Sequence, residues 1–344
     1  MSLPKPAALN TSFTRMTFLD DTQNPLFSDA DIVLFGVAFD YTASYKKGAW
    51  FGPHAIFDAS HQIEWEPPLS AMALPEVVKI HNVGILEYAK DEDACLQMVQ
   101  DTQQLAKEAF AANKKIMVFG GEHSISNGIF RAIAEQHKSQ DVTVLHIDAH
   151  LDLRDALHEN KYSHGSVLRR CRELGFSTIH VGIRDHISAE EREYVLQQKI
   201  ENNIFFCATM PREFYKKKEN LIFDKTISVQ QISAICKQIK TSRLYVTIDV
   251  DGFDSSEMPG TGTPLPHGLS IATVKDLLFQ VIEFCKKNKV EILGFDITEV
   301  SPQFKQVSSS YDVNVLVDQR TEMNAALLAY FVIFSMYQDR FSKP

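Results

Sequence analysis

Short apolar runs alternate with longer amphipathic stretches along almost the whole chain. The apolar runs are rich in β-branched and aromatic residues and have the length of buried strands. They begin near residues 31, 115, 142, 177, 203, 244 and 291. The stretches between them repeat apolar residues every three to four positions, which predicts helices near 91–112, 124–137, 164–174, 187–199, 228–240, 271–287 and 321–337. Because buried strands alternate with helices, we expect a three-layer α/β/α fold with a mostly parallel central sheet.

The alternation is not interrupted by a Pro-rich or Gly/Ser-rich linker or by an internal repeat. The chain has 344 residues, enough for two domains of the usual size of about 150 residues. We nevertheless expect a single domain over residues 31–344, preceded by an irregular N-terminal wrap over residues 1–30. The longest apolar run, Ala325–Tyr337, is too short to span a bilayer and predicts a buried helix.

Composition narrows the range of partners. The chain has 35 basic and 44 acidic residues, a formal net charge of −9, which disfavours nucleic acid and anionic membranes and favours a small cationic substrate. Its five cysteines are spread widely and form no CxxC pair, so neither a disulfide framework nor a thiolate zinc site is expected. The N-terminus lacks the basic and apolar regions of a secretory signal, and a cytoplasmic location is therefore expected.

A dinucleotide-binding site would require G-x-G-x-x-G between an early strand and a helix, and the chain lacks this pattern. The nearest candidate, Gly120-Gly121, is followed by Glu122 and His123, which offer ligands where a phosphate cradle needs bare backbone. Ser124, next in the chain, is expected to cap the following helix.

Histidines and acids instead follow four of the predicted strands. The carboxyl ends of parallel strands meet at one edge of a sheet, so these side chains should converge there. Three of them, Asp148, His150 and Asp152, alternate along an extended segment and should project to one side. The strand ends carry Glu122 and His123 after 115–119, the triplet Asp148, His150 and Asp152 after 142–147, Asp249 and Asp251 after 244–248, and Glu299 after 291–297.

Six of these side chains form a candidate metal-ligand set. A single DxD or His is more often a cap, a turn or a surface group, but three such motifs at strand ends favour a metal centre. Two imidazoles and four carboxylates carry more negative charge than one divalent ion neutralises, so two bridged ions are expected. Oxygen-rich ligands with some imidazole suit Mn²⁺, and two such ions can activate a water as hydroxide. The candidate ligands are His123, Asp148, His150, Asp152, Asp249 and Asp251, whereas His137, His146, His158, His180 and His186 are expected to be non-ligands.

Taken together, the motifs resemble the ureohydrolase superfamily, which includes arginases, agmatinases and formiminoglutamases. The resemblance extends from about Phe35 to the C-terminal helix. It implies an arginase-like fold, two Mn²⁺ ions per subunit, attack of a metal-activated hydroxide on a guanidinium carbon, and a homo-oligomer, either a trimer or a hexamer. The motifs are GGEHS at 120–124, DAHLDLRD at 148–155, SHGS at 163–166, DVDGFD at 249–254, PGTGTP at 259–264 and EVSP at 299–302.

The resemblance also implies a role for each site residue. His123, Asp148, Asp152 and Asp249 match the ligands of one metal. Asp148, His150, Asp249 and Asp251 match those of the other, so Asp148 and Asp249 would bridge the two ions. Among the catalytic residues, Asp152 would orient the hydroxide and His164 would shuttle a proton to the leaving amine. Glu299 would pair with the substrate guanidinium, for which a carboxylate is a bidentate acceptor.

Agmatine, hydrolysed to putrescine and urea, is the expected substrate, because PGTGTP and the segment 152–164 are most similar to agmatinases. The acids Asp155, Glu159 and Glu190 predict a net acidic mouth, which favours a substrate with a cationic far end. The stretch 303–320 is more similar to formiminoglutamases. The alternatives are therefore a formiminoglutamase, an arginase, a guanidinobutyrase or a small-guanidine hydrolase with the same metal site, and, outside the enzymes, an inactive metal-binding scaffold.

Overall fold

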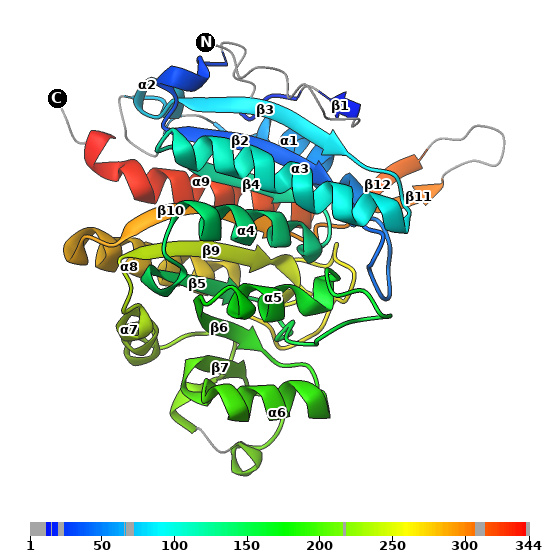
Figure 1. Cartoon of the computed structure of the whole chain (residues 1–344), viewed down its shortest axis with the longest axis vertical. Helices are drawn as coiled ribbons and strands as arrows, with labels where there is room; N and C mark the ends of the chain where they lie inside the picture. Colours follow the sequence, from blue (N-terminus) through cyan, green and yellow to red (C-terminus); the bar gives the residue numbers. More distant parts are fainter. Residues whose placement is uncertain are drawn as a thin grey trace.

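A ten-stranded sheet forms the centre of the computed structural model, which describes residues 12–14, 16–19, 24–64, 66, 72–215, 218–306 and 314–341. The strand order is β1-β3-β2-β4-β10-β9-β5-β6-β7-β8, and only β1 runs antiparallel to its neighbour (Figure 1). The predicted mostly parallel sheet is therefore confirmed. The strands are β1 (Ser12–Thr14), β2 (Ile32–Ala38), β3 (Ile80–Glu87), β4 (Lys115–Gly120), β5 (Val142–Ile147), β6 (Ser177–Ile183), β7 (Ile204–Cys207), β8 (Leu221–Ile222), β9 (Arg243–Asp249) and β10 (Glu291–Thr298).

Helices cover both faces of the sheet, and each face has its own apolar core. One core packs the sheet against α1 (Gly52–Ser60), α2 (Leu74–Val77), α7 (Val229–Gln238), α8 (Ile271–Asn288) and α9 (Arg320–Phe341). The other packs it against α3 (Glu92–Ala111), α4 (Ser126–Gln136), α5 (Val167–Glu173) and α6 (Ala189–Gln198). The strands bury both faces, which explains their near-continuous apolar sequences and confirms the three-layer α/β/α fold.

All seven predicted strands and all seven predicted helices are present, and α9 includes the apolar run Ala325–Tyr337. The structure adds elements that the pattern did not predict. Within the expected irregular wrap over 1–30, Ser12–Thr14 forms β1, which pairs with β3; most of the remaining wrap lies outside the described residues. In the stretch 303–320, β11 (Gln303–Gln306) pairs with β12 (Asn314–Asp318).

Four strands at the centre of the sheet position the candidate site. β4, β10, β9 and β5 are consecutive neighbours, and their registers place Thr298 beside Asp249 and Ile147 beside Ile248. The carboxyl ends of these four strands therefore lie at one edge, as the strand-end argument predicts. Immediately after β4 the chain passes so close to Phe39 that a Cβ on Gly121 would lie 2.0 Å from the Phe39 carbonyl oxygen. Only glycine allows this approach.

Within the described part of the chain, no helix has both the length and the apolar character needed to cross a membrane.

Candidate metal centre

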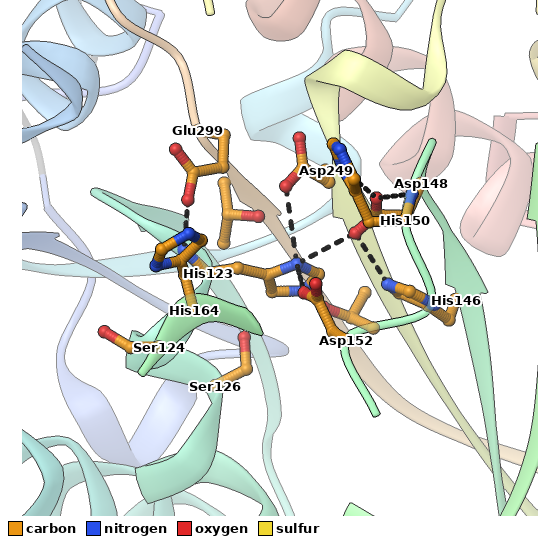
Figure 2. Close-up of polar contacts among 12 residues, drawn as sticks. His123, Ser124, Ser126, His146, Asp148, His150, Asp152, His164, Asp249 and Glu299 are labelled. Atoms are coloured by element: carbon orange, nitrogen blue, oxygen red, sulfur yellow. Dashed lines mark hydrogen bonds and ion pairs between the residues drawn. The ribbon is translucent and has the colours of Figure 1, made fainter. Parts of the chain in front are cut away.

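The first group of donors surrounds the ring of His123, just beyond β4. Its Nδ1 atom is buried and makes no hydrogen bond within the described residues. Three carboxylate oxygens face this nitrogen, from Asp148 at 3.3 Å, Asp152 at 3.4 Å and Asp249 at 3.5 Å (Figure 2). A buried, unpartnered nitrogen among three carboxylates is the arrangement expected around a cation.

The opposite side of the His123 ring explains why Nδ1 is available. Nε2 lies 2.7 Å from the hydroxyl oxygen of Thr247, and that hydroxyl donates to Asp296 at 2.6 Å. Because the single hydroxyl proton of Thr247 is used by Asp296, Nε2 must be the donor to Thr247. With its proton on Nε2, a neutral ring can present the lone pair of Nδ1 to a cation held by the three carboxylates, as a metal ligand requires.

A second group of donors lies around His150. Its Nδ1 atom is 3.3 Å from Asp148 Oδ1 and 3.1 Å from Asp251 Oδ2. Asp148 thus faces His123 with one carboxylate oxygen and His150 with the other. A carboxylate shared between two donor groups has the placement of a bridging ligand, so the residues fit two neighbouring cations.

The carboxylates are crowded in a buried space, and their electrostatics reflect this. Burial raises the pKa of Asp249 well above its usual value, and the neighbouring charges of Asp251 and Asp148 raise it further. Burial, together with the charge of Asp148, raises the pKa of Asp152 to about 6. Cations among these groups would remove the repulsion between the carboxylates.

A cavity of about 210 Å³ opens beside this cluster. Glu299, just beyond β10, lines it and is 7% exposed; its Oε1 accepts the backbone N–H of His123 at 2.8 Å. His164 lies on the same cavity, at the start of the short helix His164–Ser166. Eight residues predicted for the site are therefore close together: His123, Asp148, His150, Asp152, His164, Asp249, Asp251 and Glu299.

The three acids that the sequence predicts for the mouth, Asp155, Glu159 and Glu190, do not line the cavity. Glu190 does not line it; its carboxylate accepts the backbone N–H of Asp155 at 2.7 Å, and the side chain of Asp155 pairs with Arg170. Lys46 and Arg154 line the cavity, and neither has an ion-pair partner among the described residues. The cavity thus has two unpaired cations, but acids still outnumber them in its lining, which also includes Asp185 and Glu191.

Comparison with known proteins agrees with this geometry. The Arginase family matches residues 30–334. The chain belongs to this family. It is 31% identical over 314 residues to the N(1)-aminopropylagmatine ureohydrolase of Thermus thermophilus, an alignment that covers 89% of this chain and 90% of that protein. The chain is 27% identical over 284 residues to the agmatinase of Bacillus anthracis, and this alignment covers 82% of this chain and 87% of that protein.

Solved structures of the arginase family share its architecture. The agmatine ureohydrolase of Thermoplasma volcanium superposes with a TM-score of 0.68 at 26% identity, covering 94% of this chain and 95% of that one. The proclavaminate amidino hydrolase of Streptomyces clavuligerus superposes with a TM-score of 0.69 at 25% identity, covering 94% of this chain and 98% of that one. The expected arginase-like fold, and the expectation of a hydrolase acting on carbon–nitrogen bonds of amidines, are confirmed.

Around the candidate metal centre, the structure also reveals contacts that the sequence did not predict. His146 lies two residues before Asp148 on the same side of β5, and its Nε2 contacts Asp148 Oδ2 at 2.8 Å. Its Nδ1 faces His180 at 3.0 Å, so both ring nitrogens have partners. Asp185 Oδ2 lies 3.3 Å from His150 Nε2, where a carboxylate can orient a ligating imidazole. His146 was expected to be a non-ligand, but it belongs with His123, Asp148 and Asp152 to a group that could hold a metal ion, and the period of two along β5 was the available signal.

Proposed function

We propose that this chain is an amidinohydrolase that holds two Mn²⁺ ions and releases urea from a small guanidino substrate, with agmatine as the leading candidate and putrescine as the second product. The observation that carries the proposal is the position of Asp148 between two donor groups, His123 and His150, beside a cavity that also contains Glu299. The same resemblance to the family favours a homo-oligomer, a trimer or a hexamer.

Six side chains would hold the ions. One set comprises His123, Asp148, Asp152 and Asp249, and the other comprises Asp148, His150, Asp249 and Asp251. When bound, the ions supply Lewis acidity that lowers the pKa of a water at neutral pH. Mn²⁺ suits four carboxylates and two imidazoles without a thiolate.

The chain's own residues would bind the guanidinium and move protons. The Oε1 atom of Glu299 is occupied by the His123 N–H, and a Cβ on Gly262 would lie only 3.7 Å from Oε2. The glycine thus leaves Oε2 accessible, and a planar guanidinium can pair with it. Asp152 and His164 both line the cavity; Asp152 would accept a hydrogen bond from the attacking water and orient it, and His164 would give a proton to the leaving amine.

Agmatine as the substrate is supported by relatives named agmatinase and by Asp185, which lines the cavity with a side chain 42% exposed. A carboxylate there can receive the ammonium group at the far end of agmatine. A second candidate class, guanidino or formimino acids, is favoured by a different observation: the unpaired Lys46 and Arg154 can pair with a carboxylate.

Urea release from a substrate panel tests the proposal. Protein loaded with Mn²⁺ is assayed with agmatine, N(1)-aminopropylagmatine, arginine, 4-guanidinobutyrate and guanidine, and formamide is measured for formiminoglutamate. We expect kcat/KM for agmatine to exceed that for arginine and 4-guanidinobutyrate by about tenfold or more, the ratio that one unpaired polar contact gives. A preference for an acid that is lost in Arg154→Ala would establish the second class instead. Absence of release from every substrate would refute the hydrolase proposal.

A further inference from the structure

A chain of hydrogen bonds connects His164 to a buried acid outside the metal-ligand set. Thr42 Oγ1 donates to Glu122 Oε1, and Ser124 Oγ donates to the same oxygen at 2.6 Å. Glu122 is fully buried. Ser124 thus binds Glu122 and does not cap α4, which begins at Ser126 and lacks a side-chain cap; the sequence-based expectation for Ser124 was wrong.

The same Thr42 oxygen makes two contacts with His164. It accepts the backbone N–H of His164 at 3.1 Å and lies 3.3 Å from the ring nitrogen Nδ1. The other ring nitrogen, Nε2, lies 3.3 Å from Ser44 Oγ. Ser44 lines the cavity and Thr42 does not, so Nε2 is the ring nitrogen on the substrate side.

The protons available in this series of hydrogen bonds determine the tautomer of the His164 ring. A hydroxyl group has one proton, and that of Thr42 is directed to Glu122, whose Oε1 already accepts a second hydroxyl. Toward His164, the Thr42 oxygen can therefore only accept. A hydrogen bond between Nδ1 and Thr42 then requires the proton to lie on Nδ1, which leaves the lone pair on Nε2, facing the Ser44 hydroxyl and the cavity.

We propose that Glu122 and Thr42 are positioning residues that fix the tautomer of His164, holding a proton on Nδ1 so that Nε2 exchanges protons with the substrate. This inference rests on the proposed function, in which His164 gives a proton to the leaving amine. The neutral ring takes up at Nε2 a proton given up by the attacking water, and the resulting imidazolium passes that proton from Nε2 to the leaving amine as the carbon–nitrogen bond breaks. Thr247 and Asp296 orient His123 by the same arrangement of hydroxyl and carboxylate.

Two substitutions of Thr42 separate positioning from packing. Thr42→Val keeps the shape of the side chain and removes the hydroxyl, whereas Thr42→Ser keeps the hydroxyl. Because the tautomer matters for proton transfer and not for guanidinium binding, we expect Thr42→Val to lower kcat about tenfold or more with KM within about twofold. Thr42→Ser should restore kcat to within about threefold of the unsubstituted protein. Thr102→Val is a matched control, since the buried Thr102 hydroxyl has no hydrogen-bond partner among the described residues.

Correlation spectra of ¹⁵N and ¹H report the tautomer directly. They are recorded on the full chain, labelled with ¹⁵N at histidine and freed of Mn²⁺. The His164 signals are identified as those missing in His164→Asn. We expect the Nδ1–H form in the unsubstituted protein and loss of that preference in Thr42→Val. An Nε2–H form in the unsubstituted protein, an unchanged tautomer in Thr42→Val, or equal kcat losses in the Val and Ser variants would overturn the inference. If no guanidino substrate releases urea, the proposed function fails, while the spectra still decide the tautomer.

Discussion

Glu299 adopts a left-handed backbone conformation, with φ at 65°, and its backbone N–H donates to the carbonyl of Gly121 at 2.7 Å. This conformation directs the carboxylate toward His123 and the cavity, outside the ligand set. We expect Glu299→Gln to raise KM for a guanidino substrate about tenfold or more, since an amide loses the charge that pairs with a guanidinium. The Mn²⁺ content should stay unchanged when measured by elemental analysis. Loss of metal in parallel with activity would place Glu299 among the ligands.

Asp254, beyond β9, offers a pH-dependent prediction away from the metal ligands. Burial alone would raise its pKa, but hydrogen bonds from Lys225 and Ser256 outweigh burial and hold the pKa below its usual range. A depressed pKa means that the carboxylate stabilises the fold at neutral pH and that this contribution is lost as the pH falls. We expect Asp254→Asn to lower the free energy of unfolding by about 1–3 kcal/mol at pH 7.

The difference in free energy of unfolding between Asp254→Asn and the unsubstituted protein should become smaller as the pH falls below about 4, where aspartate is protonated in the unfolded chain. Urea denaturation at several pH values measures it. Asp276→Asn on the exposed face of α8 is the control and should change little at any pH. A difference independent of pH would show that the Asp254 charge is not responsible.

At the level of single residues, sequence reasoning brought the strand-end groups together because parallel strands end at one edge. Asp148, Asp249 and Glu299 follow directly from that rule. Asp185 lies two residues beyond β6, so the same rule could have found it. Thr42 could not be predicted, because it lies four residues beyond β2 on a loop whose path depends on tertiary packing. The predicted acids Asp155 and Glu190 do not line the cavity, because they make local contacts with each other and with Arg170.

At the level of elements, α6 begins with a capping box that contacts the segment next to the candidate metal centre. Ser188 and Glu191 hydrogen-bond each other across the first turn, and Glu191 also accepts the backbone N–H of Leu153 at 3.2 Å, next to Asp152. α7 has an equivalent box formed by Ser228 and Gln231, without a connection to the ligands.

Ser188→Ala and Ser228→Ala should each lower the free energy of unfolding by about 1 kcal/mol, the usual cost of a lost cap. Only Ser188→Ala should also weaken Mn²⁺ binding, by about two- to threefold, because Glu191 then holds Leu153 less firmly. Thermal unfolding and metal titration of both variants measure the two effects. Equal Mn²⁺ affinities in the two variants would show that the cap does not support the site.

Two elements that the sequence pattern did not predict, β3 and α1, have separate physical causes. β3 carries His81, Asn82 and Glu87, and several of its side chains are only partly buried because the short β1 is its outer neighbour. Its sequence therefore lacks the continuous apolar run of the central strands. Helix α1 has nine residues and begins with Gly52 and Pro53, too short a stretch to show a clear helical period.

At the level of the whole molecule, two apolar cores hold the sheet rigid, and the charged cluster lies at the edge where the central strands end. Burying several carboxylates together is unfavourable without cations, so metal binding and stability should be linked. The central claim is that the cluster holds two ions bridged by Asp148 and Asp249.

Equilibrium dialysis against Mn²⁺, followed by elemental analysis, tests this claim most directly. We expect two ions per chain in the unsubstituted protein. Asp148→Asn and Asp249→Asn should each retain one ion or none, because an amide does not supply the bridging charge. Two ions per chain together with normal turnover in either variant would contradict the bridging assignment.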